Sequence, residues 1–283
     1  MSGGGGRAGQ RGIAVFAVLL VLALGIGIAV TAVQLRTAQL LDGTRQDRLG
    51  RQLERLAAAV ADYYTRTAAA MDTADAAPVD CPTLLGALAS GDVRELQEIG
   101  RLACVIGTRQ RMAGGTLAWR SIWLWLPPED AQADATLYDP DSDQLLPAAG
   151  VLWQHVDGRA IQTALLQRSF DQQERLADYL NTFYRAHAAG NAALNFWARE
   201  PCPQAPSPAT RDAPACTAGA YADATAVLGG LGAPDAWLVD AWGRPFQFRN
   251  GGADLPASAP FAALLRLRAP WGFDFDMTLG AAH

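Results

Sequence analysis

An uncharged apolar run near the N-terminus constrains the fold of this chain more than any other feature. Residues 13–33 contain only Ile, Ala, Val, Phe, Leu, Gly and one Thr, and the nearest charged residues are Arg11 and Arg36. A helix rises about 1.5 Å per residue, so this run crosses the roughly 30 Å hydrocarbon core of a bilayer once. The sequence therefore predicts a basic leader over residues 1–12 and a single transmembrane helix over residues 13–35, in contact with membrane lipid.

The charges beside this run predict its orientation. Arg7 and Arg11 precede it and no acidic residue does, so the positive-inside rule places the N-terminus in the cytoplasm and the rest of the chain outside. A cleaved secretory signal is the alternative, but the apolar core of such a signal is normally about 7 to 15 residues long. The greater length, and the poor cleavage site at residues 33–35, favour an uncleaved anchor.

The chain beyond the span is acidic and long enough for one or two domains with their own cores. All 23 basic residues of the chain are arginine, and two of them precede the span. Residues 36–283 thus carry 21 Arg and 28 acidic residues, a formal charge of 21 − 28 = −7. Because phosphate binding needs a basic surface, this charge argues against nucleic acid as a partner.

The four cysteines, Cys81, Cys104, Cys202 and Cys216, all lie beyond the span. They form no C-x-x-C pair and have no histidine at zinc spacing. An even number of cysteines in an exported, oxidising setting predicts two disulfides, with free buried thiols as the alternative. Three pairings are open, and the simplest joins the two local pairs.

A long amphipathic helix is predicted directly after the span, over residues 36–70. One apolar stripe recurs at spacings of 4, 3, 4 and 3 and consists of Leu49, Leu53, Leu56, Val60 and Tyr63. The stripe covers barely two heptads, so we expect it to pack on a globular domain of the same chain rather than to form a coiled coil.

The chain contains an internal repeat with an offset of 120 residues. The matched positions are Gln52, Glu54, Arg55, Leu56, Ala57 and Tyr64, which correspond to Gln172, Glu174, Arg175, Leu176, Ala177 and Tyr184. Each copy leads to a Cys-Pro pair, a second cysteine and a Trp-rich stretch, residues 119–126 and 237–242, where we expect strands. The pattern predicts two units, residues 36–150 and 151–283; chance similarity between two amphipathic helices is the alternative.

The N-terminus resembles the prepilin leader of type IV pilins and type II secretion pseudopilins. The resemblance rests on Arg11-Gly12 before Ile13, on the short basic leader and on the amphipathic extension of the membrane helix. In that family a membrane peptidase cuts after the glycine on the cytoplasmic side and methylates the new N-terminus. The resemblance therefore implies that Gly12 and Ile13 form a processing site and that a prepilin peptidase is a partner.

A second segment, Asp240-Ala-Trp242-Gly243-Arg-Pro245-Phe246, resembles the Asp-x-Trp-Gly-x-Pro-aromatic segment of pseudopilin heads. The residue types fit such a role, because Gly243 permits a turn, Pro245 fixes φ and the two aromatic residues supply core area. Together the two matches imply an α+β fold, in which the membrane helix continues into one pilin-like head, or two in tandem, of a helix and a small antiparallel sheet. They also imply other pilin-like subunits as partners.

The chain departs from the family pattern at two positions. The fifth mature residue, usually Glu, is Ala17, and the first, usually Phe, is Ile13. The glutamate is thought to pair with the N-terminus of a neighbouring subunit during assembly. Its absence resembles the minor, tip-located pseudopilins.

Residues typical of catalysis or of cofactor binding form no recognisable motif in this sequence. The chain lacks the phosphate-binding, dinucleotide-binding, zinc-protease and serine-hydrolase motifs, so we expect no cofactor, no bound metal and no catalytic residue. Asp139, Asp141 and Asp143 have the alternate spacing of a calcium loop but lack its glycine and a clear final glutamate, which favours a solvated acidic turn. Asp274 and Asp276 alternate with apolar residues, as on a strand with one exposed face.

These observations favour a non-enzymatic pilin-like subunit of a type II secretion or type IV pilus machine, anchored in the bacterial inner membrane with its head in the periplasm. One alternative is a bitopic envelope protein whose exported domain senses or scaffolds. The other is an anchored periplasmic enzyme, which would need Asp139, His155 or His187 to converge in one site.

Overall fold

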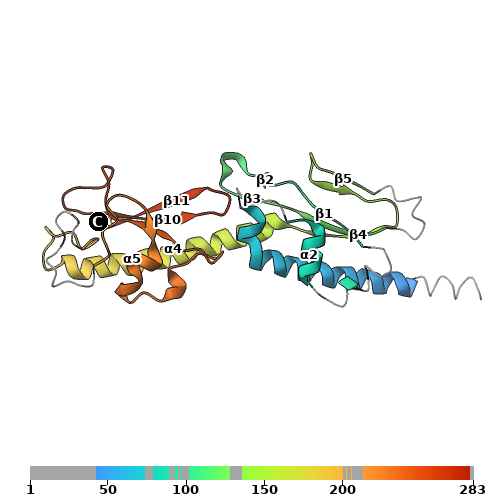
Figure 1. Ribbon diagram of the computed structural model, residues 1–283, viewed down its shortest axis with the longest axis horizontal. Coiled ribbons are helices and arrows are strands. Elements are labelled where there is room, and N and C mark those ends of the chain that lie inside the picture. Colours follow the sequence, from blue (N-terminus) through green and yellow to red (C-terminus); the bar gives the residue numbers. More distant parts are fainter. Residues whose placement is uncertain are drawn as a thin grey trace, which may run out of the picture. The chain divides into compact units, whose positions relative to one another are not determined.

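The computed structural model describes residues 43–73, 79–88, 93–94, 96, 102–127, 136–199, 202, 205 and 213–280. This part of the chain is a mixed α and β structure with small antiparallel sheets, which confirms the predicted α+β class (Figure 1). Its helices include none that is both long enough and apolar enough to cross a membrane. The predicted leader and the predicted span, residues 13–35, lie outside the described residues.

The chain forms two compact units, residues 1–54 and 55–283. We call residues 55–156 the first half and residues 157–283 the second half of the larger unit. The predicted boundary at residue 150 lies six residues before this division. Residues 152–156 belong to the first half because they form a strand that pairs with the sheet of that half.

Residues 43–72 are helical, within and just beyond the predicted amphipathic helix. The apolar stripe is buried as expected through Val60, but it then passes through the fully buried Tyr64 rather than the predicted Tyr63, and it continues to Ala68 and Met71. A helix has 3.6 residues per turn, so a stripe with a spacing of 3.5 drifts by about 20° in each heptad. After two heptads the next residue along the chain lies on the buried face.

The sheet of the first half has three antiparallel strands in the order β1-β4-β7. The strands are β1 (Ala103–Ile106), β4 (Ile122–Leu126) and β7 (Leu152–Val156). Alternate residues of β4, Ile122, Leu124 and Leu126, are at most 2% exposed, as expected for side chains on the core face of a sheet. The strand predicted within residues 119–126 is therefore confirmed.

Several short elements complete the first half. They are α2 (Cys81–Leu88), the 3₁₀ helix η1 (Ala113–Gly115) and two small hairpins. One hairpin joins β2 (Gln110–Arg111) and β3 (Ala118–Trp119), and the other joins β5 (Leu137–Asp139) and β6 (Gln144–Leu146).

The second half begins with the 31-residue helix α4 (Gly158–Ala188). Asp157 caps it, because its Oδ1 accepts hydrogen bonds from the backbone N–H groups of Arg159 (2.9 Å) and Ala160 (3.2 Å). At the first helical residue, a Cβ on Gly158 would lie 1.9 Å from the carbonyl oxygen of Arg120 and 2.6 Å from Cε1 of Tyr64. Only glycine fits at this close approach of α4 to the first half.

The matched positions of the 120-residue repeat have similar environments. Leu56 and Leu176 are 1% and 0% exposed, and Tyr64 and Tyr184 are 0% and 9% exposed. Each helix is followed by a disulfide and a small antiparallel sheet, but the two sheets differ in strand number and order. The resemblance between the halves therefore lies in the helices more than in the sheets.

The second sheet has four antiparallel strands in the order β11-β10-β9-β8 and packs against α4 (Figure 1). The strands are β8 (Ala222–Asp223), β9 (Gln247–Arg249), β10 (Ala263–Arg268) and β11 (Asp274–Leu279). Short helices α5 (Ala224–Leu228), η3 (Gly229–Leu231) and η4 (Asp235–Trp237) lie between β8 and β9 in the chain. The core of this half contains, among others, Leu176, Leu180, Phe246, Phe248 and Leu265.

The predicted strand over residues 237–242 was wrong. The segment begins in the 3₁₀ helix η4 and continues into a tight turn that starts at Asp240. The side chain of Asp240 competes with strand pairing for the backbone, and Gly243 has a left-handed φ of 77° that a strand does not accommodate.

Candidate functional site

The Asp240–Phe246 segment forms a turn that is closed by one buried carboxylate. Oδ1 of Asp240 accepts hydrogen bonds from the backbone N–H groups of Trp242 and Arg244, both at 2.9 Å. Ser169 of α4 anchors the turn, since its hydroxyl oxygen accepts the N–H of Ala241 at 3.1 Å. These hydrogen bonds explain why the segment on which the family resemblance rests forms a turn.

Pro245, the proline of the Asp-x-Trp-Gly-x-Pro segment, completes the turn. Pro245 lies opposite Val239 in an isolated antiparallel bridge, and the backbone N–H of Phe246 donates to the carbonyl of Leu238 at 3.0 Å. Burial raises the pKa of the Asp240 carboxyl to about 6, although its two backbone hydrogen bonds act in the opposite direction.

A buried polar network connects this turn to the first half. The indole of Trp242 donates to Gln162 of α4, and Nε2 of Gln162 donates to Oδ2 of Asp72 at 2.6 Å and to the carbonyl of Ala68 at 3.2 Å. The hydroxyl of Tyr64 also donates to Oδ2 of Asp72. Gln162 and Asp72 are both fully buried, so this network joins the two halves through their interior.

Asp72 lies at the centre of the network and keeps an incompletely satisfied carboxylate. Its Oδ1 is buried and has no hydrogen-bond partner among the residues that the structure describes, and the guanidinium Nε of Arg120 lies 3.9 Å away. Burial raises the pKa of the Asp72 carboxyl, against the hydrogen bonds from Tyr64 and Gln162 and the positive charge of Arg120. Burial and the adjacent carboxylate in turn raise the pKa of the Tyr64 hydroxyl.

The four cysteines form two disulfides, which confirms the prediction of disulfide bonding. The bonds join the local pairs, Cys81 with Cys104 and Cys202 with Cys216, across 23 and 14 residues of sequence. The first ties the start of α2 to β1, and the second lies beside a pocket of the second half that could hold a ligand.

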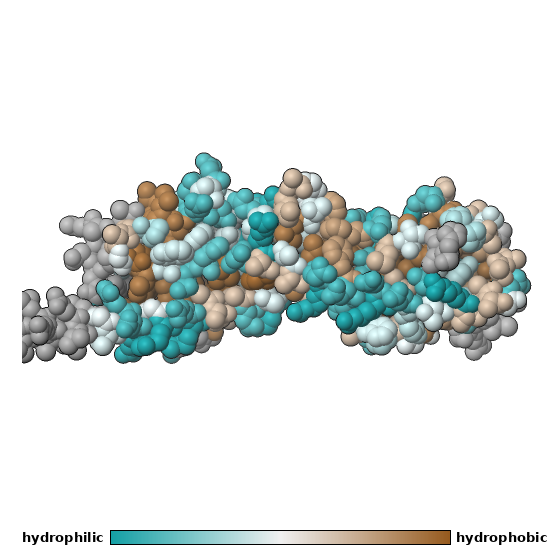
Figure 2. Space-filling model, turned by 180° about the vertical axis from the view of Figure 1, so that it is seen from behind, coloured by the Kyte–Doolittle hydropathy of each residue, from teal (hydrophilic) through white to brown (hydrophobic). Residues whose placement is uncertain are grey.

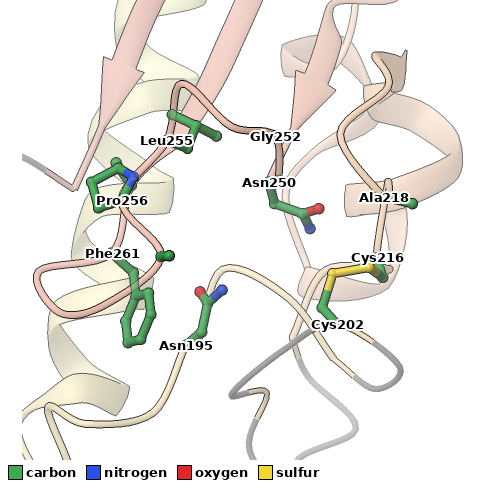
Figure 3. A pocket seen from close by; sticks show the side chains of 12 residues that line it. Asn195, Cys202, Cys216, Ala218, Asn250, Gly252, Leu255, Pro256 and Phe261 are labelled. Carbon is green, nitrogen blue, oxygen red and sulfur yellow. A yellow bond between two sulfur atoms is a disulfide. The ribbon is translucent and has the colours of Figure 1, made fainter.

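This pocket has a volume of about 420 Å³ and lies between the second disulfide and the loop that connects β9 to β10 (Figure 3). Leu255, Pro256, Ala257, Phe261 and Ala262 supply its apolar lining, and the Cys202–Cys216 disulfide with Ala218 lies opposite. The described residues that line the pocket include no charged side chain. Its volume falls in the range of about 300 to 1,000 Å³ that is typical of ligand pockets.

Asn250 holds the pocket wall together. Its Oδ1 accepts hydrogen bonds from the N–H and the hydroxyl of Thr217, both at 2.9 Å, and its Nδ2 donates to the carbonyls of Trp197 and Ala215, both at 2.8 Å. These bonds fix three chain segments that lie far apart in the sequence. The pocket is therefore preorganised by Asn250 together with the disulfide.

Asn195 is the second amide in the pocket, and its amide group points into the space beside Phe261 (Figure 3). The side chain is 9% exposed, and its Oδ1 accepts the backbone N–H of Trp197 at 3.1 Å. That bond assigns the other amide atom as the nitrogen, which donates no hydrogen bond to the residues the structure describes. The pocket thus combines apolar walls with one free donor.

The acidic turn predicted over residues 139–143 is present, and its carboxylates bond within the turn. Asp139 accepts from the N–H of Asp141 at 3.0 Å and from the hydroxyl of Ser142 at 2.6 Å, and these bonds lower its pKa. Asp143 accepts from the hydroxyl of Tyr138 at 2.7 Å. Over the described ranges, no group of three or more His, Cys, Asp or Glu side chains is placed to hold a metal ion.

Asp139, His155 and His187, which an enzymatic site would need to bring together, make separate local contacts. His155 stacks on Trp123 with ring centroids 4.0 Å apart, and burial lowers its pKa. His187 lies in the last turn of α4, where its Nδ1 is 2.8 Å from the carbonyl oxygen of Phe183. The structure does not join these side chains into one site.

Asp274 and Asp276 lie on β11, as their alternation predicted, and bind a neighbouring arginine. Arg266 on β10 contacts Oδ1 and Oδ2 of Asp276 at 2.7 and 2.9 Å and Asp274 at 2.8 Å. The guanidinium of Arg266 also lies 3.8 Å from the centroid of the Tyr221 ring. These contacts stabilise the exposed face of the sheet.

Hydrophobic side chains are also exposed on the surface. Figure 2 shows hydrophobic areas of the surface between hydrophilic ones. Among the described residues, the large apolar side chains that are exposed all belong to the first half: Met112, Leu137, Leu146 and Trp153. Leu137 and Leu146 pair directly across the β5–β6 hairpin.

Sequence reasoning did not identify Asp72, Gln162, Asn195 or Asn250. The hydrogen-bond partners of Asp72, Gln162 and Asn250 include residues 33 to 94 positions away, and no local spacing marks such a role. Asn195 acquires its role only as part of the folded pocket.

The predicted processing residues Gly12 and Ile13 lie outside the described residues. The four cysteines and the motif residues Asp240, Trp242, Gly243 and Pro245 all lie within them. No protein-family model matches this chain, and no curated protein or solved structure matches it significantly.

Proposed function

We propose that this protein is a non-enzymatic pilin-like subunit of a type II secretion or type IV pilus machine. In this role, residues 13–35 anchor it in the bacterial inner membrane, with the N-terminus in the cytoplasm and the α+β head in the periplasm. Prepilin peptidase cleaves between Gly12 and Ile13, and the subunit then acts by assembling with other pilin-like subunits.

The observation that carries this proposal is the sequence of elements in the described chain. A long helix with one buried face leads through a disulfide into a small antiparallel sheet, and α4 repeats this order. The head turn also has a physical basis, because Asp240 and Gly243 adopt the conformations that the Asp-x-Trp-Gly-x-Pro pattern requires. These features support two tandem pilin-like heads.

The two disulfides support a location outside the cytoplasm. Disulfides form and persist in oxidising compartments such as the bacterial periplasm, whereas cytosolic thiols are kept reduced. Both bonds lie in the part of the chain that the positive-inside rule places outside the membrane.

The substitution of the usual glutamate by Ala17 favours a minor subunit at the tip of a fibre. An apolar residue at this position cannot form an ion pair with the N-terminus of a neighbouring subunit in the membrane. Repeated addition along a shaft would lack that contact, whereas a single subunit at a tip would not need it.

The second candidate function is a bitopic envelope protein with an exported sensing or scaffolding domain. The pocket beside Cys202 and Cys216 favours it, because a preformed pocket suits a domain that recognises a ligand. In that case the leader stays attached and the apolar segment is a plain anchor.

The intact mass of the membrane-extracted protein, from cells with and without prepilin peptidase, separates the two. The pilin-like role predicts a chain that begins at N-methylated Ile13 only when the peptidase is present. A Gly12→Ala variant should keep residues 1–12 in both cells, and an Ala14→Gly variant is the matched control. A wild-type chain that retains residues 1–12 in both cells would eliminate the pilin-like role.

A further inference from the structure

The pocket of the second half has a chemical character that defines what it can bind. Leu255, Pro256 and Phe261 present apolar surface to it, and the described lining residues carry no charge. A charged ligand would lose its hydration there without a compensating partner, which is costly. An apolar, uncharged group is therefore the suitable occupant.

One hydrogen-bond donor adds to this character. Asn195 is about nine-tenths buried, its Oδ1 is used by the N–H of Trp197, and its Nδ2 is left without an acceptor among the described residues. The amide points into the pocket (Figure 3). Water can reach this donor in the pocket. An occupant that displaces the water leaves the donor unpaired, at a cost in free energy, unless it brings an acceptor of its own.

A peptide supplies both groups within one residue. An aliphatic or aromatic side chain fills the apolar space, and the carbonyl of the same residue is an uncharged acceptor one or two bonds from its Cα. A hydrocarbon has no acceptor, and a carboxylate has a charge that the lining does not neutralise.

We infer that this pocket binds an apolar residue of an extended segment from another polypeptide, with the backbone carbonyl of that residue accepting a hydrogen bond from Nδ2 of Asn195. The wall opposite the apolar loop is held by the four hydrogen bonds of Asn250 and by the Cys202–Cys216 disulfide, so binding orders little additional chain on that side. This site goes beyond the proposed assembly role and does not depend on processing of the leader.

The probe for this site is a capped leucine analogue, N-acetylated and N-methylamidated, that carries a photoreactive diazirine in its side chain. The full chain in lipid nanodiscs is irradiated with the probe, and labelled residues are identified by mass spectrometry. We expect saturable labelling of residues 255–262, which N-acetyl-leucine N-methylamide displaces. The glutamate analogue of that competitor should not displace it.

Two variants test the geometry. Ala257→Trp places a large side chain at an exposed position on the pocket wall and should abolish the saturable labelling, whereas Ala253→Trp, exposed on the same loop outside the lining, should preserve it. Asn195→Asp keeps the acceptor for Trp197 but removes the donor, so the competitor should bind about 2- to 10-fold more weakly or worse. Unchanged hydrogen exchange in α4 shows that this variant is folded.

The inference is overturned if labelling of residues 255–262 is not saturable, or if it is equal in the Ala257→Trp and Ala253→Trp variants. It is also overturned if toluene, which has no acceptor, displaces the probe from the wild type and from Asn195→Asp equally well, because the pocket would then be a site for small hydrocarbons. Since these readouts do not involve residues 1–12, failure here leaves the pilin-like role standing. Retention of the leader likewise leaves the pocket standing.

Discussion

The indole Nε1 of Trp242 donates a hydrogen bond of 2.9 Å to Oε1 of Gln162, a residue 80 positions earlier in the chain. Through this bond the turn that resembles a pseudopilin head motif is linked to Asp72 at the end of the first helix. The tryptophan of the motif therefore has a polar role in addition to its apolar contacts with Trp271, whose ring centroid is 5.5 Å away.

Replacement of Gln162 by Ala should destabilise the protein by about 1–3 kcal/mol, because the indole of Trp242 loses its acceptor and the buried Asp72 loses a donor. Urea unfolding of the full chain in nanodiscs, followed by tryptophan fluorescence, measures the change. Thr163→Ala, at the neighbouring exposed position of α4, should stay within about 0.5 kcal/mol of the wild type. Equal midpoints for the two variants would show that the network contributes nothing.

The contribution of Asp240 to stability should fall as the pH rises from about 4 to 6. The pKa of Asp240 is about 6 in the folded state and close to 3.8 when unfolded, so the folded state binds more protons in this window. The pKa difference of about 2 corresponds to about 3 kcal/mol, and the raised pKa of Asp72 acts in the same direction.

The variant Asp240→Asn isolates the share of Asp240 in this pH dependence. Asparagine keeps an Oδ1 acceptor for the turn but cannot titrate, so its free energy of unfolding should decline less between pH 4 and pH 6 than that of the wild type. Urea unfolding at several pH values gives both curves. Parallel curves would contradict the assignment of a raised pKa to Asp240.

Loss of either disulfide should cost about 3 kcal/mol, since the two loops have similar lengths of 14 and 23 residues. The two disulfide variants should differ in which part of the chain becomes less protected. In a Cys202→Ser/Cys216→Ser variant, hydrogen exchange should accelerate in residues 250–262, whereas the Cys81→Ser/Cys104→Ser variant should accelerate it in β1. Faster exchange in residues 250–262 of both variants would argue against a local role of the second disulfide.

The free energy of unfolding of an Asn250→Ala variant should fall by about 3 kcal/mol, because the buried carbonyl of Trp197, the half-buried carbonyl of Ala215 and the Thr217 hydroxyl lose their partner together. Asn191→Ala is the control, since Asn191 is exposed and bonds only its own turn, with the N–H of Ala193 at 3.2 Å. Thermal unfolding followed by near-ultraviolet circular dichroism compares them. A control that is as destabilised as Asn250→Ala would remove the special role of Asn250.

Local patterns predicted the elements well where burial follows a simple period. The stripe of residues 49–60, the strand within residues 119–126 and the alternation at Asp274 and Asp276 were each found. The segment 237–242 was misassigned because its apolar residues favour a strand, whereas the two hydrogen bonds that the Asp240 side chain accepts from the backbone favour a turn. The pocket could not be predicted, since Asn195, Cys216 and Phe261 meet only after the chain has folded.

The crowding around Gly158 restricts which sequences can adopt this architecture. A Cβ at this position would meet the backbone oxygen of Arg120, which cannot move aside as a flexible side chain would. Any chain built the same way must therefore have glycine directly after the helix cap. Gln162, four residues later, and the Trp242-Gly243 pair, 80 residues beyond it, belong to the same interface through the hydrogen bond from Trp242 to Gln162. This combination is a search pattern that follows from three-dimensional constraints, and it can identify distant relatives whose overall sequences have diverged.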